Sequence, residues 1–501
     1  MQRSHQRADT PTGHVVVIGG GIAGLAAAHR LVATGLRVTL LEGADRLGGK
    51  LMTGEIAGVQ VDLGAESMLA RRPEAVGLAG EVGLADRLQP PATATASLWT
   101  RDALRPMPQG HVMGVPGDPA ALGGVLSPEG LARIARERDL APAAVGDDVA
   151  VGAYVADRLG HEVVDRLVEP LLGGVYAGDA YRISMRAAVP QLFEAVKEGG
   201  PLLESVRRVQ ERAAARQRTG PVFQGIRGGL GTLPGAVGDA VRAGGGEIRT
   251  ETPVLGLTRT DGGWAVRTET GTIAADGIVL ATPAWSAATL LAAECPAASA
   301  ELSAVEYASM ALVTLAFRRS DIEANEALRG RSGFLVPPVD GRTIKASTFS
   351  SNKWSWVADA APGLFVLRTS VGRYGEEDHL QREDGELVAV SLRDLAAATG
   401  LTARPVDTEV TRWTGGLPQY PVGHLGRVAR IRDEVARLKA LRVCGAVYDG
   451  VGIPACIGGA QRAADEISRD LGGRHGTGAG GDHRHADPGS GHGERGGTIA
   501  V

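Results

Sequence analysis

The sequence predicts an α/β fold in which one parallel sheet is assembled from separate stretches of the chain. Three observations predict it. An apolar strand at residues 15–18 runs into a glycine-rich turn and a helix, and a second apolar run follows at 38–41. Residues 277–280 form a third buried strand that ends before Pro283, and a late strand, glycine turn and helix occupy 441–470. This order predicts a discontinuous Rossmann-like domain, with a β-rich substrate domain and a helical insert between its parts.

The first strand, helix and strand carry a dinucleotide-binding pattern. Residues 15–24 read VVVIGGGIAG, which places Gly19-x-Gly21-x-x-Gly24 between strand and helix. Gly19 allows the tight turn, Gly21 lets a pyrophosphate approach the helix N-terminus, and Gly24 lets helix and strand pack closely. Glu42 ends the second strand at roughly the 20-residue spacing from which an acid binds a ribose hydroxyl. The alternative is a chance turn in a chain with 72 glycines, but the complete β-α-β context favours nucleotide binding.

Changes in composition divide the rest of the chain. Residues 91–115 are rich in proline, helical spacing begins after Ser127-Pro128, and the stretch beyond Gly472 is rich in glycine and histidine. We therefore expect a dinucleotide-binding domain of residues 14–90, 222–300 and 408–472, a β-rich substrate domain of residues 91–118 and 301–407, a helical domain of residues 119–221, and disordered tails of residues 1–13 and 473–501.

Composition and charge exclude several classes of protein. The net charge of −4 gives no basic excess, so we expect no nucleic-acid partner. The three cysteines lack metal-ligand spacing and are too few for a disulfide framework, so we expect no metal and a reducing, cytoplasmic location. The N-terminus lacks the apolar core of a signal peptide, and the longest uncharged stretch, 277–293, is shorter than the roughly 20 residues of a membrane span. Peripheral membrane contact through an apolar helix face stays open as an alternative.

Further motifs, spread over nearly the whole chain, resemble those of the FAD-dependent amine oxidase superfamily. The matching segments are Glu42-x-x-x-Arg46-x-Gly48-Gly49, Asp62-x-Gly64-Ala65-Glu66, Ala281-Thr282-Pro283, and residues 445–453 followed by Gly458-Gly459 and Ala463-Ala464. The resemblance implies an FAD-binding domain that ends with the C-terminal glycine turn and helix. Because the surroundings of Cys456 do not match the site where some relatives attach their flavin, the resemblance implies noncovalent FAD.

Four narrower segments are similar to the oxygen-dependent porphyrinogen oxidases of haem biosynthesis. They are residues 170–179 (PLLGGVYAGD), 333–337 (GFLVP), 350–354 (SSNKW) and 413–424 (WTGGLPQYPVGH). That family implies FAD-dependent oxidation of a porphyrinogen by O₂ with release of H₂O₂. The alanine-, glycine- and arginine-rich composition suggests a GC-rich monoderm bacterium. This favours coproporphyrinogen III as the substrate and coproporphyrin III as the product.

Alternatives to this function stay open at the level of sequence. Protoporphyrinogen IX is the other porphyrinogen that the family oxidises. A different flavin oxidase or desaturase would act on amines or carotenoid precursors, and a non-enzymatic relative of the fold would bind no flavin. The intact Glu42 and the C-terminal glycine turn argue against the last of these. The expected partners are the porphyrinogen, O₂ and, transiently, the next enzyme of the haem pathway.

The resemblance also implies which residues contact FAD. They are Gly19, Gly20, Gly21, Ile22, Ala23 and Gly24 at the pyrophosphate, Glu42 and Gly43 at the ribose, Val254 at the adenine, Lys50, Gly64, Ala65, Glu66 and Ser67 in loops beside the flavin, and Trp413, Val451, Gly452 and Ile453 near the isoalloxazine. For Trp413 the alternative is a core aromatic. The glycine turn and helix of the C-terminal motif can aim backbone N–H groups at the pyrimidine edge of the flavin.

A flat macrocycle with propionate groups needs an apolar slot and cations at its rim. The candidate cations are Arg71, Arg72, Lys345 and Lys353, and the candidate slot walls are Tyr176 and Phe334. For each cation, the alternative is a solvated surface charge. The chemistry is centred on the flavin, and His424 is the one side chain that we single out as a candidate base. A histidine satisfied within a loop is the alternative for His424.

Overall fold

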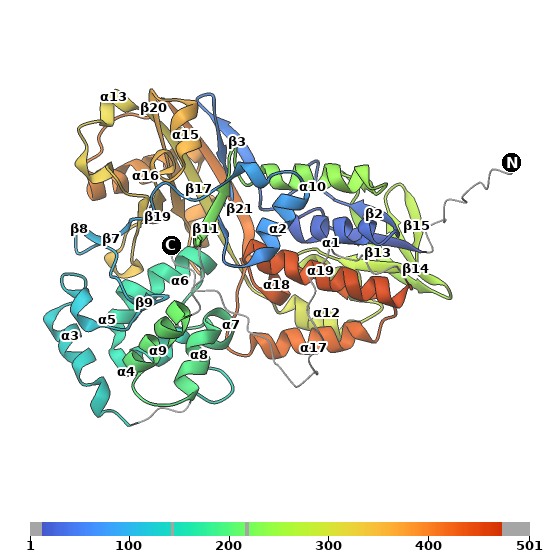
Figure 1. Cartoon of the computed structure of the whole chain (residues 1–501), viewed down its shortest axis with the longest axis horizontal. Coiled ribbons are helices and arrows are strands. Elements are labelled where there is room, and N and C mark those ends of the chain that lie inside the picture. The colour runs from blue at the N-terminus through green and yellow to red at the C-terminus, as the bar shows by residue number, and fades with distance from the viewer. Residues whose placement is uncertain (1–12, 142–144, 216–219, 473–501) are drawn as a thin grey trace.

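The computed structural model describes residues 13–141, 145–215 and 220–472, and its central element is a five-stranded parallel sheet (Figure 1). The strand order is β12 (Glu247–Arg249), β2 (Arg37–Leu41), β1 (His14–Ile18), β16 (Gly277–Leu280) and β22 (Leu441–Val443). Strand β1 is buried along its whole length, as its apolar sequence predicts. The discontinuous parallel sheet of an α/β fold is therefore confirmed.

Helices cover one face of this sheet. The helices α1 (Ile22–Ala33), α10 (Thr232–Ala243) and α19 (Ile453–Asp470) share one hydrophobic core, to which Leu25, Val237 and Ile457 contribute. The opposite face is covered by the antiparallel strands β13 (Val254–Thr260), β14 (Gly263–Thr268) and β15 (Gly271–Ala275), and by the helices α11 (Ala284–Leu291), α12 (Pro296–Ser303) and α17 (His424–Ala436). The sheet is thus enclosed on both faces, as parallel sheets are.

The first and last helices of the sheet lie side by side and run in the same direction (Figure 1). Arg30 Nε lies 2.7 Å from Asp465 Oδ1, and Thr34 Oγ1 lies 3.2 Å from Ser468 Oγ one turn further on. Since both helices advance together, their N-termini lie at the same end, and α19 begins about one turn before the level of Ile22. The N-terminal glycine loop and the C-terminal glycine turn therefore lie at the same end of this helix pair.

A second sheet of seven strands forms the β-rich part. Its order is β21 (Asp407–Pro418), β17 (Tyr307–Arg318), β20 (Leu364–Val371), β19 (Ile344–Thr348), β18 (Gly333–Leu335), β7 (Ala96–Thr100) and β8 (Ala103–Pro106). Helix α16 (Asp384–Thr399) packs on one face through a shared core. The expected boundary at residue 408 differs from the structure, because β21 pairs antiparallel with β17 from Asp407 onwards and belongs to this sheet.

A helical unit lies at the lower left of Figure 1, below the β-rich part. Its main helices are α3 (Pro128–Ala135), α4 (Val151–Leu159), α6 (Glu169–Tyr176), α8 (Pro190–Lys197) and α9 (Leu202–Ala215). Of the expected tails, residues 1–12 and 473–501 lie outside the described residues.

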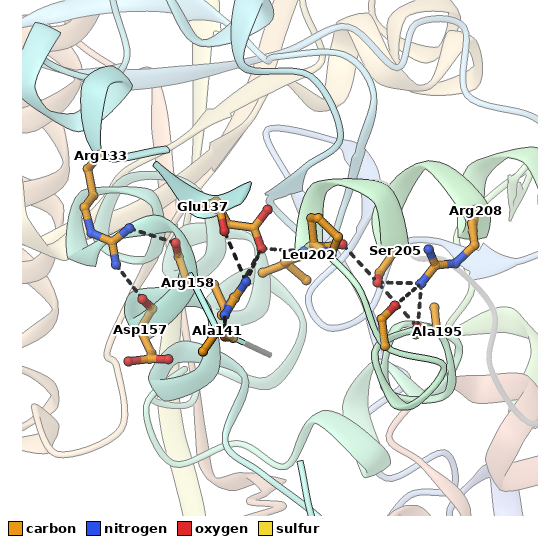
Figure 2. Close-up of polar contacts among 11 residues, drawn as sticks. Arg133, Glu137, Ala141, Asp157, Arg158, Ala195, Leu202, Ser205 and Arg208 are labelled. Atoms are coloured by element: carbon orange, nitrogen blue, oxygen red, sulfur yellow. Dashed lines mark hydrogen bonds and ion pairs between the residues drawn. The ribbon is translucent and has the colours of Figure 1, made fainter. Parts of the chain in front are cut away.

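A buried ion pair joins three elements of this helical unit (Figure 2). Glu137 Oε1 accepts hydrogen bonds from Arg158 Nη2 at 2.9 Å, from Arg158 Nε at 3.1 Å and from the backbone N–H of Leu202 at 2.6 Å. Nearby, Arg208 Nη2 donates to the carbonyl oxygens of Ala195 and Gly199 at the end of α8. These contacts fix α4 and α9 relative to the 136–141 turn.

Candidate cofactor and substrate site

The glycine loop between β1 and α1 has the shape that a pyrophosphate needs. A methyl group on Gly24 would overlap the carbonyl oxygen of Gly19, whereas one on Gly21 would meet no atom within 4 Å. Gly21 is the N-cap of α1, its helix has no side-chain cap, and the first turn holds no acid. Open space therefore lies at the positive end of a helix dipole, as the binding of an anionic phosphate requires.

Glu42 lies beside this loop. Its Oε2 accepts a hydrogen bond from Gly20 N at 2.6 Å, and its Oε1 accepts one from Ala44 N at 2.8 Å. The carbonyl oxygen of Glu42 accepts a hydrogen bond from Thr252 N at 2.8 Å, which brings the segment before Val254 against Gly43. Glu42, Gly43 and Val254 are thus brought together at one end of the loop, as a ribose and an adenine would require.

A second helix N-terminus is open at the same end of the sheet. Gly452 is the exposed N-cap of α19, and this helix also lacks a side-chain cap and an acid in its first turn. The side chain of Lys50 lies close by. Lys50 is exposed to solvent, yet burial by surrounding protein lowers its pKa, with Cys456 of α19 opposing the shift. Lys50 is thus accessible to solvent although protein surrounds it, and we call the accessible region beside Lys50 and the N-terminus of α19 the recess.

The loop of residues 62–67 forms a wall of this recess. A methyl group on Gly64 would overlap the carbonyl oxygen of Lys50 and would lie 3.2 Å from Cζ2 of Trp413. The indole Nε1 of Trp413 donates to the carbonyl oxygen of Leu63 at 2.9 Å. Ala65, on the same loop, is exposed. Lys50, Gly64 and Trp413 therefore meet beside the recess, which lies at the same end of the sheet as the loop after β1 and the N-terminus of α19.

The carboxylate of Glu66, a predicted cofactor contact, is engaged by two cations of the protein. Its side chain is 7% exposed, its Oε1 lies 2.8 Å from Lys353 Nζ, and its Oε2 lies 3.4 Å from Arg368 Nη2. Burial would raise the pKa of Glu66, but the two cations outweigh burial and lower it, so the carboxylate is ionised. Both carboxylate oxygens are thus engaged by cations, and Lys353 is not a free partner for a propionate.

The two predicted slot walls are both buried. Phe334 packs edge-on against Trp99 and Phe349 at 6.0 and 6.1 Å, in the core that α16 covers, so the expectation that it lines a slot is wrong. Its neighbour Leu335 belongs instead to the core of the helical unit. Tyr176 is buried with its ring 5.6 Å from that of Tyr420, and it joins the helical unit to the segment after β21.

The remaining predicted cations differ in their surroundings. Arg72 forms an ion pair with Glu74 in the first turn of α2 (Pro73–Glu81), and Arg71 beside it is exposed. Lys345 on β19 is 8% exposed, and its Nζ has no hydrogen-bond partner among the described residues. Burial lowers its pKa to about 7, and Arg373 adds to this effect. The substrate role expected for Lys345 stays a prediction.

Replacing Lys345 by methionine should stabilise the protein at neutral pH. The pKa of Lys345 is about 7 in the folded state, whereas the ordinary value of 10.5 applies to the unfolded state. The unfolded state therefore binds the proton more tightly. Lys345 therefore lowers the free energy of unfolding by its full amount below pH 7, and this destabilisation disappears as the pH rises to about 10.5. We expect Lys345→Met to raise the free energy of unfolding by roughly 1–3 kcal/mol at pH 7 and by little at pH 10. Urea unfolding at both pH values checks this, with exposed Lys439→Met as the control that should show neither change.

His424 is buried at the start of α17 and does not resemble a base that is open to substrate. Its Nε2 lies 2.9 Å from the carbonyl oxygen of Val447, and its ring stacks on Tyr420 at 4.2 Å. Burial lowers its pKa to about 4, so the imidazole is neutral at pH 7 and Nε2 carries the proton. The position favours the structural alternative for His424.

Two residues of the site were missed at the level of sequence. Arg368 is the single charge in the mostly buried strand LFVLRTSV, and such a charge in an apolar run is the signal that could have identified it. Tyr307 lies with its ring 5.8 Å from Lys50 Nζ, and its hydroxyl accepts a hydrogen bond from Ala284 N. Within the described ranges, no group of three His, Cys, Asp or Glu side chains could hold a metal ion, and no helix has the length and hydropathy to cross a bilayer.

Comparison with known proteins agrees with this geometry. The family described as flavin containing amine oxidoreductase matches residues 22–468. The chain is 38% identical to coproporphyrinogen III oxidase of Mycobacterium tuberculosis (strain ATCC 25618 / H37Rv) over 92% of this chain and 98% of that protein. It is 32% identical to coproporphyrinogen III oxidase of Bacillus subtilis (strain 168), over 90% of this chain and 97% of that protein. It is also 30% identical to protoporphyrinogen oxidase of Bos taurus, over 90% of this chain and 98% of that protein.

Solved structures show the same fold. A crystal structure from Exiguobacterium sp. 255-15, named as a candidate protoporphyrinogen oxidase, superposes with a TM-score of 0.81 at 32% identity and covers 91% of this chain and 99% of its own. Cyclohexylamine oxidase from Brevibacterium oxydans superposes with a TM-score of 0.66 at 18% identity, covering 92% of this chain and all of its own. At that lower identity the second likeness concerns the fold alone.

Proposed function

Because the chain belongs to the flavin containing amine oxidoreductase family, we propose that it is an FAD-dependent enzyme that oxidises coproporphyrinogen III to coproporphyrin III. The observation that carries the proposal is the 38% identity to the Mycobacterium tuberculosis coproporphyrinogen III oxidase over 92% of this chain. The recess supports it, because its two open helix N-termini, α1 and α19, suit the pyrophosphate and the flavin of one FAD.

The chain's own residues bind and orient the reactants. Gly19 to Gly24 would hold the pyrophosphate, Glu42 would bind the ribose, and the N-terminus of α19 would bind the flavin, because both helices lack a side-chain cap and Glu42 lies beside Gly20. FAD supplies the two-electron chemistry. We propose that a porphyrinogen loses six electrons and six protons in three such steps, and that three O₂ molecules accept them as three H₂O₂. Noncovalent FAD is part of the proposal, because Cys456 is buried with its Sγ 3.5 Å from the carbonyl oxygen of Gly450.

Protoporphyrinogen IX is the second candidate substrate, and the 30% identity to the Bos taurus protoporphyrinogen oxidase favours it. The higher identity to several bacterial coproporphyrinogen III oxidases places coproporphyrinogen first. We propose a cytoplasmic location, supported by three cysteines that are buried and unpaired. Contact with a membrane surface and with the next haem-pathway enzyme are further parts of the proposal that need their own binding measurements.

A side-by-side assay of the two porphyrinogens tests the function. Each substrate is mixed with FAD-loaded protein in air, and porphyrin fluorescence and H₂O₂ are followed against a reaction without protein, because porphyrinogens also oxidise spontaneously. We expect coproporphyrinogen III to be oxidised at least tenfold faster than protoporphyrinogen IX, with three H₂O₂ per porphyrin. Faster turnover of protoporphyrinogen IX would select the second candidate. Rates equal to the blank with both substrates would exclude this function.

A further inference from the structure

The wall loop of the recess is held from behind by a cluster of one acid and two cations. Arg368 Nη1 donates to the carbonyl oxygen of Gly64 at 2.7 Å and to that of Asp62 at 3.3 Å, while its Nη2 pairs with Glu66. Lys353, from the short helix α14 (Ser350–Lys353), pairs with the other oxygen of Glu66. The carboxylate belongs to the dinucleotide-binding part of the chain, whereas both cations come from the β-rich part.

The cluster carries a surplus of positive charge. Two cations flank the carboxylate of Glu66. The buried carboxyl group of Asp62 also interacts with Glu66 and Arg368, and it accepts hydrogen bonds from Leu230 N and Gly231 N at 3.0 Å. Burial raises the pKa of Asp62 to about 7, so at neutral pH it carries only part of a negative charge and the net charge of the cluster is positive. Side chains in the cluster are 7–20% exposed, so solvent screens this charge less than it would at the surface. Ala65, between the two anchored residues Gly64 and Glu66, is exposed.

We propose that Glu66, Lys353 and Arg368 form a positioning cluster through which the β-rich part fixes the loop of residues 62–67 against the flavin and raises the flavin's reduction potential. Arg368 fixes the position of the loop, because its guanidinium group binds both the carbonyl oxygen of Gly64 and the carboxylate of Glu66. The net charge supplies the potential, because a reduced flavin is richer in electrons and is stabilised by nearby positive charge. The inference rests on the flavin site of the proposed function but not on the identity of the substrate.

Charge variants separate this role from a purely structural one. Lys353→Met removes one positive charge, and Glu66→Gln removes the negative charge while keeping the size of the side chain. We expect the midpoint potential of bound FAD, measured by reductive titration against a reference dye, to fall for Lys353→Met and to rise for Glu66→Gln. A structural role alone would move both potentials in the same direction or move neither, and either result would overturn the proposal.

A third variant separates position from charge. Arg368→Lys keeps the charge but loses the fork, so we expect an unchanged potential and at least tenfold weaker FAD binding, measured by flavin absorbance after dialysis. Lys353→Arg keeps the positive charge and should therefore keep the wild-type potential. If Glu66→Gln does not retain FAD, the comparison of Lys353→Arg with Lys353→Met is enough to test the electrostatic role. Glu137→Gln, in the buried pair of Figure 2, is the matched control: it should lower stability and leave the potential unchanged.

These measurements need no porphyrinogen. If neither porphyrinogen is oxidised but the two potentials shift in opposite directions, the proposed substrate is wrong and the positioning cluster stands. If the porphyrinogen is oxidised but Lys353→Met leaves the potential unchanged, the enzyme assignment stands and the cluster has no electrostatic role.

Discussion

Replacing Gly21 by alanine should abolish FAD binding while leaving the fold intact. The backbone of Gly21 has φ −68° and ψ 174°, which alanine adopts without strain, and its added methyl group meets no protein atom. That methyl group would instead occupy the space that the pyrophosphate needs above the N-terminus of α1. We expect at least a 100-fold loss of FAD affinity, or about 2.8 kcal/mol, with little change in the melting temperature of the apoprotein. Flavin absorbance after dialysis and calorimetry of the apoprotein measure the two effects.

Two further glycines serve as controls for Gly21→Ala. Gly77, in the exposed part of α2, also has open space around it, so Gly77→Ala should leave FAD binding unchanged and stabilise the helix slightly. Gly24→Ala should instead lower the melting temperature of the apoprotein, because its methyl group collides with the carbonyl oxygen of Gly19. Normal FAD binding by Gly21→Ala would show that the phosphates do not approach this loop.

The parts of the fold that were predictable from sequence are those that local pattern determines. Strand β1, its glycine turn and α1 follow from consecutive apolar residues, glycines at fixed spacing and apolar helical positions, all within 20 residues. The burial of β16 follows in the same way. The predicted domain boundary at residue 408 misses the edge strand β21, because its polar sequence gives no sign that it pairs with β17.

The candidate site was predictable only where backbone shape determines it. Gly21 and Gly24 have the roles expected of them because a turn and a close approach leave few alternatives. Glu66 and Lys353 are 287 positions apart, and no local pattern shows that they neutralise each other. Phe334 illustrates a different limit. Neighbouring strand residues face opposite sides, so a short apolar run such as GFL does not reveal which of Phe334 and Leu335 faces the core under α16.

Replacing Arg158 by methionine should strongly destabilise the helical unit. Arg158 and Glu137 are 4% and 1% exposed at their side chains, and Arg158 also donates to the carbonyl oxygen of Ala141 at 2.6 Å. Without the guanidinium, Glu137 becomes a buried charge whose one remaining side-chain hydrogen bond among the described residues comes from Leu202 N. Such an uncompensated charge costs about 3–5 kcal/mol. We expect hydrogen exchange to accelerate first across α4 and α9, and urea unfolding monitored by circular dichroism to begin at a lower concentration.

The double variant Glu137→Leu with Arg158→Met distinguishes two causes of the destabilisation. One is the loss of the hydrogen bonds of Arg158, and the other is the buried carboxylate of Glu137 that is left without a cation. If the cost arises from the unpaired carboxylate, removing it should restore most of the stability, because a buried ion pair is often no more stabilising than apolar side chains of similar size. A double variant as unstable as Arg158→Met alone would show instead that the hydrogen bonds to Ala141 and Leu202 carry the stability. Arg329→Ala, which breaks an exposed pair with Glu326, should change the free energy of unfolding by less than about 0.5 kcal/mol and calibrates the measurement.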